Sequence, residues 1–224
     1  MPVQISKDKF VRFTYNPDYL QPKKYKKTIS DVDSICKAIN LTTIKSKLIV
    51  DGGNVSRTTD KVIMCDKVFH ENKHLSERNL IKQLKNLFEV DKLSLWDVND
   101  FIGHADGMVR FIDSDTVLIN DYSKENAEFQ RCFRMSLHNA GLDWIELPYN
   151  PPNDPKLISA KGLYLNYLQM EQAVIVPTFK TKIDDKAVKV LEQVFKGQTI
   201  ATVDSNELAD EGGILNCISW NITA

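Results

Sequence analysis

The chain has 224 residues, of which 42% are hydrophobic and 26% are charged. This composition is ordinary for a globular protein, and the length suffices for one large domain or two small ones. Lysine and arginine total 29 against 30 acidic residues, for a net charge of -1, so we expect neither nucleic acid nor a membrane surface as a partner. No apolar run approaches the roughly 18 residues that cross a bilayer. Residues 1–4 lack the pattern of a signal peptide, so we expect a cytoplasmic location.

A pattern of strand, helix and strand recurs four times along the chain. The leading strands are expected to begin at residues 10, 61, 116 and 173, which are 51, 55 and 57 residues apart. Short runs rich in β-branched residues predict the strands, and apolar residues three and four apart predict the helices. In chain order the expected elements are strand 10–15, helix 30–39, strand 47–50; strand 61–66, helix 75–88, strand 92–96; strand 116–121, helix 124–140, strand 143–147; and strand 173–177, helix 184–195, strand 198–203.

One such copy cannot bury its own apolar face, so we expect the four copies to pack together. The predicted fold class is α/β, in a single domain that spans residues 1–224. A stretch with four prolines, 148–160, is the one long irregular connection. It is either a functional flap or a solvent-exposed loop, and the sequence leaves both readings open.

A group of polar residues precedes three of the leading strands, and a similar group follows the last copy. If the copies are related by rotation, equivalent positions face a common axis, so these groups are expected to converge. Their members are Asp51-Gly52-Gly53-Asn54, Gly103-His104-Ala105-Asp106-Gly107, Gly162-Leu163-Tyr164-Leu165-Asn166, and Glu211-Gly212-Gly213 with Asn216-Cys217. The alternative is that each Gly-Gly pair is only a turn, that His104 is a structural histidine and that Asp106 is solvated.

The residue types in these groups suit nucleophilic catalysis. A cysteine such as Cys217 attacks as a thiolate, which a nearby imidazole or a cationic substrate favours. A histidine held by a carboxylate can donate and accept protons. Cysteine, histidine and one acid would also suit an amidase or a thiol protease, but a second acid beside His104 favours a planar cationic substrate.

The other three cysteines, Cys36, Cys65 and Cys132, are expected to be structural and to behave as small buried hydrophobic residues. None of the four cysteines forms a CxxC pair. We therefore expect no zinc or other metal site.

The four polar motifs together resemble the agmatine deiminase and bacterial-type peptidylarginine deiminase family. This family belongs to the guanidino-modifying superfamily and has the pentein, or α/β-propeller, fold. The resemblance extends over essentially the whole chain. It implies a fan of repeated ββαβ modules, of which about four of the family's five would be present, with the site on the axis. It implies no metal and no organic cofactor.

The resemblance also implies roles for individual residues. Cys217 would attack the guanidinium carbon, and His104 would protonate the departing ammonia and then activate water. Asp106 would hold the guanidinium nitrogens, and Asp51 would orient the histidine. Substrate-binding residues would be Asn166, Gly213 and Asn54. The substrate would be agmatine, whose deimination is a step of putrescine biosynthesis, or else arginine or an arginyl peptide. Many agmatine deiminases carry a histidine immediately before the cysteine, where this chain has Asn216. This difference favours the peptidylarginine branch or an uncharacterised branch of the family.

One family motif, Trp-x-Arg-Asp-x-x-Pro, would fall before residue 1, and its aspartate is a second guanidinium-binding carboxylate. We therefore expect the chain to be N-terminally incomplete relative to the family, either as a truncated product or as a variant without the first module, and to turn over substrate weakly or not at all. Unpaired strand edges would then favour a homo-oligomer. Two alternatives stay open: a non-catalytic guanidinium-binding or assembly module with the same fold, and an amidinotransferase.

Overall fold

The computed structural model describes residues 1–96, 104–151 and 158–223. The chain divides into two compact units, Met1–Ala105 with Ile222–Ala224, and Asp106–Asn221. Each unit is described by itself, and the expectation of one domain over the whole chain stays a prediction. Gly103 and residues 152–157, which belong to two of the features predicted above, lie outside the described residues.

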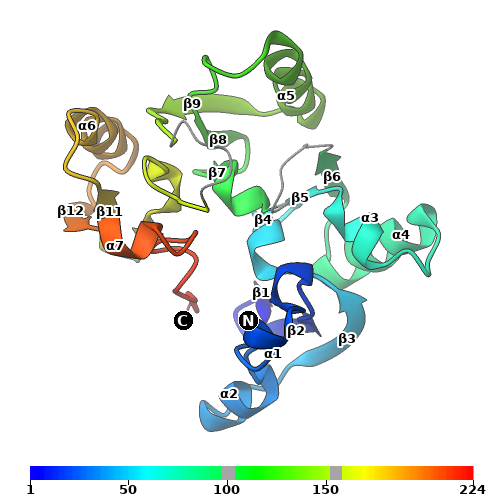
Figure 1. Ribbon diagram of the computed structural model, residues 1–224. Coiled ribbons are helices and arrows are strands. Elements are labelled where there is room, and N and C mark those ends of the chain that lie inside the picture. Colours follow the sequence, from blue (N-terminus) through cyan, green and yellow to red (C-terminus); the bar gives the residue numbers. More distant parts are fainter. Residues whose placement is uncertain (97–103, 152–157, 224) are drawn as a thin grey trace. The chain divides into compact units, whose positions relative to one another are not determined.

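Each unit contains two ββαβ modules, and each module forms one three-stranded sheet (Figure 1). In every sheet the first two strands are antiparallel and the last two are parallel, with a helix between the parallel pair. Parallel neighbours require such a crossover. The modules of the first unit are β1 (Val3–Ser6), β2 (Lys9–Thr14), α2 (Val32–Ala38) and β3 (Ile44–Ile49), then β4 (Ser56–Arg57), β5 (Lys61–Cys65), α4 (Glu77–Phe88) and β6 (Lys92–Trp96). Those of the second unit are β7 (Val109–Phe111), β8 (Thr116–Asn120), α5 (Ala127–Ala140) and β9 (Asp143–Leu147), then β10 (Leu168–Gln169), β11 (Ala173–Thr178), α6 (Asp184–Val194) and β12 (Thr199–Asp204).

Short helices occupy the connections. Within the described residues, four of them are single 3-10 turns: η1 (Asp18–Leu20), η2 (Gly52–Asn54), η3 (Ala105–Gly107) and η4 (Tyr164–Asn166). The others are α1 (Lys23–Lys26), α3 (Lys67–Glu71) and α7 (Asn206–Ala209). The last three 3-10 turns each come just before the first strand of a module, where the sequence has its polar groups.

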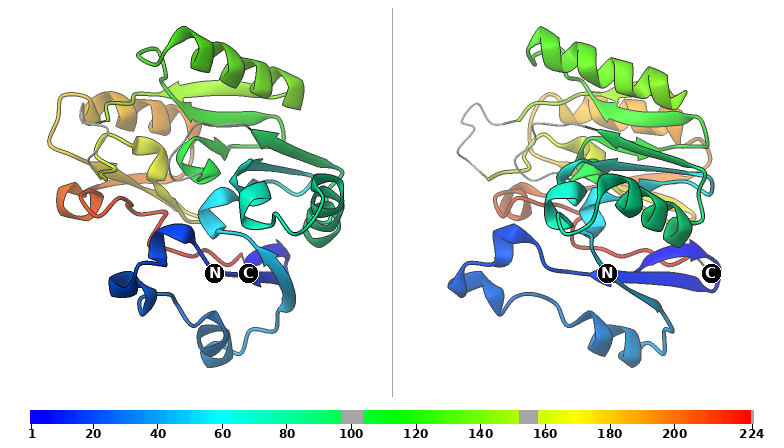
Figure 2. Two further views of the ribbon diagram at one scale, coloured as in Figure 1. Left: turned by 45° about the vertical axis from the view of Figure 1, so that its right-hand side comes forward. Right: turned by 90° about the vertical axis from the view of Figure 1, so that its right-hand side faces the viewer.

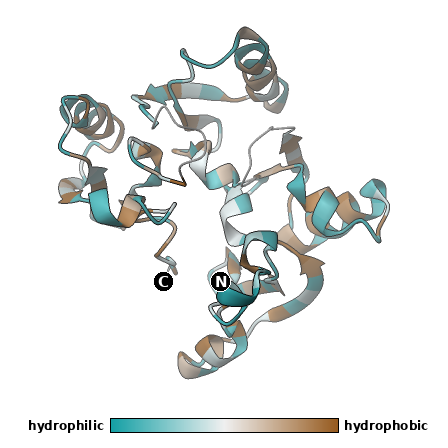
Figure 3. Ribbon diagram, in the orientation of Figure 1, coloured by the Kyte–Doolittle hydropathy of each residue, from teal (hydrophilic) through white to brown (hydrophobic). Residues whose placement is uncertain are grey.

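The long helices are amphipathic, as their sequence spacing predicts. Leu80, Leu84 and Phe88 lie on the buried stripe of α4, four residues apart, and the mixed colouring of α4, α5 and α6 in Figure 3 shows apolar and polar faces on each helix. The two views in Figure 2 show α5 running alongside its own sheet. Among the helices of the described residues, none combines the length and the apolar character needed to cross a membrane.

Each unit has its own hydrophobic core. In the first unit the core joins residues of both modules, from Val11 and Phe13 of β2 to Leu84 and Phe88 of α4. In the second unit it joins Leu118 and Leu147 of one module to Val176 and Leu191 of the other. Two neighbouring modules therefore bury their apolar faces against each other, as the repeat predicts.

The predicted strands and helices agree with the structure to within a few residues, but each module begins with a further strand that the repeat does not predict. The repeat predicts one strand before each helix, whereas every module has two. The additional strands β1, β4, β7 and β10 have two to four residues, which is too short for an alternating pattern to be recognised. Cys36 and Cys65 are buried as expected, but the expectation of burial is wrong for Cys132, which is exposed on α5.

The helix α5 offers a test of the core of the second unit. Leu137 is fully buried and Met135, two residues earlier, is 52% exposed. We expect Leu137→Ala to lower the free energy of unfolding by about 2–5 kcal/mol, because it leaves a cavity. Met135→Ala should change it by no more than about 0.5 kcal/mol. Urea denaturation of both variants measures the difference, and equal effects would contradict this packing of α5.

Candidate active site

All the predicted site residues except Asn54 lie in two clusters, one in each unit. The histidine cluster consists of Asp51 and His104 with Tyr19 and Gly53, in the first unit. The cysteine cluster consists of Asp106, Asn166, Gly213, Asn216 and Cys217, in the second.

Asp51 lies two residues after the end of β3 and forms the N-cap of η2. Its Oδ1 accepts a hydrogen bond from the main-chain N–H of Gly53 at 3.3 Å, as capping aspartates do. The preceding strand is held by the buried Asn72, whose Oδ1 accepts from Ile49 N at 2.9 Å and whose Nδ2 donates to Ile49 O at 2.8 Å. The sequence thus places a 7% exposed carboxylate at a fixed point after the strand.

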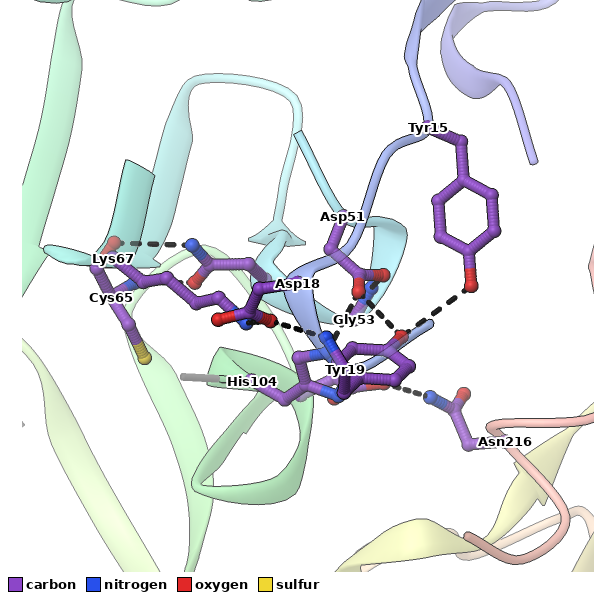
Figure 4. Close-up of polar contacts among 11 residues, drawn as sticks. Tyr15, Asp18, Tyr19, Asp51, Gly53, Cys65, Lys67, His104 and Asn216 are labelled. Atoms are coloured by element: carbon purple, nitrogen blue, oxygen red, sulfur yellow. Dashed lines mark hydrogen bonds and ion pairs between the residues drawn. The ribbon is translucent and has the colours of Figure 1, made fainter. Parts of the chain in front are cut away.

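The Oδ2 atom of Asp51 is shared by two side chains (Figure 4). His104 Nε2 lies 3.0 Å from it, and the Tyr19 hydroxyl donates to it at 2.7 Å. The rings of Tyr19 and His104 meet edge to face, with centroids 5.9 Å apart. Gly53 completes the contact, because a Cβ atom at this position would lie 2.8 Å from His104 Nδ1. A glycine is therefore required where the imidazole packs against η2.

The charge on Asp51 depends on this arrangement. Burial raises the pKa of the Asp51 carboxyl, but the hydrogen bond and charge of His104, followed by the Tyr19 hydroxyl, outweigh burial and lower it to about 2. Burial and then the negative charge of Asp51 raise the pKa of Tyr19, so its hydroxyl keeps the proton that it donates. An ionised Asp51 can orient His104 and stabilise its protonated form.

Tyr19 itself is held by its neighbours. Asp18 forms an ion pair with Lys67 at 3.0 Å, and the Lys67 ammonium lies 5.4 Å from the centroid of the Tyr19 ring. The hydroxyl of Tyr15 is 3.4 Å from that of Tyr19. Tyr19 was not found by sequence reasoning, because η1 lies in the first connection, away from the polar groups that recur.

Glu71, at the end of α3, is another buried carboxyl group of the first unit. Both of its oxygens are buried without a hydrogen-bond partner within the part of the chain that the structure describes. Burial raises the pKa of Glu71 to about 7, with the charge of Lys67 acting in the opposite direction and that of Asp51 adding to it. Its titration near neutral pH is thus well separated from that of Asp51.

The cysteine cluster is organised by Asn166, which is 1% exposed at the end of η4. Its Nδ2 donates to Cys217 Sγ at 3.0 Å. Its Oδ1 accepts from the main-chain N–H groups of Asn216 at 2.9 Å and Cys217 at 3.3 Å. Cys217 is exposed, so one buried amide fixes both the sulfur and the main chain of an accessible cysteine.

Asn216 and Gly213 complete the cysteine cluster. The side-chain amide of Asn216 donates to Asp106 Oδ2 at 2.7 Å, which is the bond drawn from the labelled Asn216 in Figure 4. Asp106 is 9% exposed. A Cβ atom on Gly213 would lie 2.8 Å from Cys217 Cβ, so this glycine allows the close approach of the cysteine turn.

The structure thus brings Asp51 to His104 in the first unit, and Asn166 to Cys217 and Asp106 to Asn216 in the second. Asn54 has a different environment from the other predicted residues: its amide bonds to the main-chain O and N of Cys65 at 3.1 and 2.6 Å. Its assignment to substrate binding stays a prediction, as do the roles of the other residues. Within the described residues, no group of three or more His, Cys, Asp or Glu side chains is arranged to hold a metal ion.

Comparison with known proteins defines the class first and then the family. The solved structure of C. jejuni agmatine deiminase matches with a TM-score of 0.77 at 23% identity, covering 93% of this chain and 66% of that chain. The predicted pentein fold is therefore confirmed. The sequence profile described as Porphyromonas-type peptidyl-arginine deiminase matches residues 1–222. The chain belongs to this family.

Curated relatives are longer than the chain. The agmatine deiminase of Pseudomonas aeruginosa (strain UCBPP-PA14) is 22% identical over 205 residues, which cover 76% of this chain and 54% of that protein. A Mycoplasma mycoides protein provisionally named agmatine deiminase is 23% identical over 220 residues, which cover 83% of this chain and 60% of the relative. The chain thus spans a little over half the length of these relatives.

The shared oxygen of Asp51 leads to a pH-dependent prediction. In Tyr19→Phe the carboxylate loses one donor, so we expect the pKa of Asp51 to rise from about 2. A carboxylate with a lowered pKa stabilises the folded state above its unfolded value, and this stability is lost as the pH falls through the folded pKa. Acid unfolding of Tyr19→Phe should therefore begin at a higher pH than in the wild type.

The carbon-13 resonance of the Asp51 carboxyl measures this pKa directly. Tyr15→Phe is the control, since the Tyr15 hydroxyl contacts the Tyr19 hydroxyl, whereas the Tyr19 hydroxyl is the one that donates to Asp51. An Asp51 titration that is unchanged in Tyr19→Phe would contradict the role given to this hydroxyl.

Two adjacent glycines test the packing of His104. A Cβ atom at Gly53 would collide with the imidazole, whereas one at Gly52 would have only Met1 N at 4.0 Å. We expect Gly53→Ala to shift the imidazole nitrogen resonances of His104 and Gly52→Ala to leave them near the wild-type positions. Similar spectra for the two variants would mean that the His104 imidazole does not pack against η2 at Gly53.

Proposed function

We propose that this protein hydrolyses a guanidinium group to a ureido group and ammonia, with Cys217 as the nucleophile. The observation that carries the proposal is the hydrogen bond of 3.0 Å from the buried Asn166 amide to the sulfur of an exposed cysteine. A donor at this place favours the thiolate over the thiol. A cysteine with only a structural role would gain nothing from it.

The proposed reaction has two stages. Cys217 Sγ bonds to the guanidinium carbon, and one nitrogen leaves as ammonia after it accepts a proton from His104. A water molecule then gives a proton to His104 and bonds to the same carbon, and the C–S bond breaks to regenerate the thiolate. The second proton of that water passes to the released ammonia, so the sum consumes one guanidinium and one water and yields one ureido group and one ammonium ion. No electron transfer is involved.

The two clusters divide the roles of this reaction. Asp51 holds His104 and stabilises its charged form before the first proton transfer and after the second, as its low pKa supports. Asp106 supplies a carboxylate for the guanidinium nitrogens, and its bond to Asn216 ties it to the residue beside the nucleophile. Asn166, Gly213 and Asn54 are proposed to assist substrate binding.

The substrate class is a small guanidinium compound or an arginyl peptide. The curated relatives carry the name agmatine deiminase, and the matching family is named for peptidyl-arginine. These names support both kinds of substrate, the small guanidinium compound and the arginyl peptide. A cytoplasmic location and a homo-oligomeric state stay predictions. Because the chain spans only part of its relatives, the activity of the whole protein belongs to the proposal.

Turnover assays with matched cysteine variants test the function. We expect ammonia and the ureido product from agmatine, arginine or an arginyl peptide, and loss of at least about a hundredfold of this activity in Cys217→Ser and in His104→Gln. Cys132→Ser, which replaces the other exposed cysteine, should keep the wild-type rate. Activity that survives in Cys217→Ser would contradict the proposal.

The two other candidate functions give different results in the same assays. Calorimetric binding of agmatine without product would indicate a guanidinium-binding module. A product that appears only when an amine acceptor is added would indicate an amidinotransferase. Neither binding nor product with any of these guanidines would overturn the guanidine-based function altogether.

A further inference from the structure

The main chain on both sides of Asn166 is held by Arg110, a residue that has no role in the proposed reaction. Arg110 projects from β7, and its Nη1 donates to Leu165 O at 3.2 Å and also to Tyr167 O. These two carbonyl groups belong to the residues immediately before and after Asn166. The guanidinium group of one arginine therefore fixes the main chain on both sides of the residue that holds Cys217.

The ring of Tyr167 completes this attachment. The Arg110 guanidinium carbon lies 3.8 Å from the centroid of the Tyr167 ring, a distance at which the cation and the aromatic face attract each other. Tyr167 is fully buried and packs edge to face on Phe195, with centroids 5.4 Å apart. The arginine is thus anchored in the core of the second unit and has little freedom to move.

From these contacts we propose that Arg110 is a positioning residue for Cys217, acting through Asn166. The path has two steps. Arg110 sets the main chain of η4 and β10, and this fixes the direction of the Asn166 amide. The amide then bonds to Cys217 Sγ and to the main-chain N–H groups of Asn216 and Cys217. The inference rests on the proposed function of Cys217 as nucleophile.

A planar guanidinium suits this task better than an ammonium. It can donate to two carbonyl groups from one plane and stack on a ring at the same time, whereas a lysine is a point charge on a flexible stem. The side chain of Asn166 is short, and both its Nδ2 and its Oδ1 form hydrogen bonds, so it cannot adjust to a shift of its own main chain without losing a bond. A small rotation of η4 would therefore lengthen the bond to the sulfur.

The test follows the reactivity of the cysteine rather than turnover. We would measure the rate of alkylation of Cys217 by iodoacetamide over a pH series, with peptide mass spectrometry to separate the two exposed cysteines. Cys132, on α5, is the internal control in every sample. Arg110→Met removes the donors and keeps most of the apolar stem.

We expect the alkylation profile of Cys217 in Arg110→Met to move to higher pH by up to about one pH unit, since a hydrogen bond to a charged group is worth about a factor of ten in an equilibrium. The profile of Cys132 should not move. Asn166→Ala removes the contacting amide itself and sets the upper limit of the effect. Arg110→Lys, which keeps a cation and one donor group, should give an intermediate profile. Asp106, bonded to Asn216, is the charged group of the cysteine cluster and is unchanged in all three variants.

A stability control separates positioning from a general loss of structure. Arg57, on β4 of the first unit, also donates to a main-chain carbonyl, that of Gln4. Arg57→Met should lower the thermal midpoint without moving the Cys217 profile. If Arg110→Met folds and leaves the Cys217 profile unchanged, or if Arg110→Met and Arg57→Met move it equally, the positioning role is wrong. Should Arg110→Met fail to fold, the same criteria apply to Arg110→Lys.

The outcome does not depend on catalysis. An alkylation profile that shifts in Arg110→Met, in a protein with no activity on any guanidine, would support the positioning role and overturn the proposed function. Normal turnover that is lost in Cys217→Ser, together with an unchanged profile in Arg110→Met, would do the reverse.

Discussion

A single oxygen atom, Asp51 Oδ2, determines what His104 can do. It lies 3.0 Å from His104 Nε2 and accepts the proton of Tyr19 at 2.7 Å. Burial alone would favour the neutral carboxyl group, and an uncharged Asp51 would neither orient an imidazole nor stabilise its cation. The two partners reverse this preference and hold the pKa of Asp51 at about 2. The rest of the histidine cluster, including the ion pair of Asp18 and Lys67, supports the tyrosine that shares the oxygen.

The repeat explains how the side chains of both clusters come to their positions. In the last three modules a 3-10 turn precedes a very short first strand, and a polar side chain in or beside that turn bonds to a neighbouring segment. Asp51 at η2 and Asn166 at η4 follow this rule in different units. The two glycines that approach a functional side chain, Gly53 and Gly213, serve the same geometry, because each leaves room for the residue on which the proposed chemistry depends. A small local motif, used repeatedly, thus supplies the fixed points of the proposed site.

Much of this could be predicted from the sequence, and the exceptions have physical reasons. The strands β6 and β9 have the predicted bounds, and the helix α4 ends at the predicted residue, because short apolar runs and helical apolar spacing are strong local signals. The first strands were implied only by the family resemblance, since two residues such as Ser56–Arg57 carry no pattern. The repeat predicts that Asp51 and His104 lie near each other, and the family resemblance implies that Asp51 orients the histidine. Tyr19 and Arg110 were not, because they act through hydrogen bonds between segments that are distant in the sequence and belong to no recurring group.

The central claim is that Cys217 forms a covalent bond to a guanidinium carbon. Its most direct test is acid quenching of the protein during reaction with agmatine, followed by mass spectrometry of the peptide that contains Cys217. The account predicts an added mass equal to the substrate minus ammonia on this cysteine and no addition on Cys132. Product formation without any adduct on Cys217, or with the adduct on another residue, would contradict it.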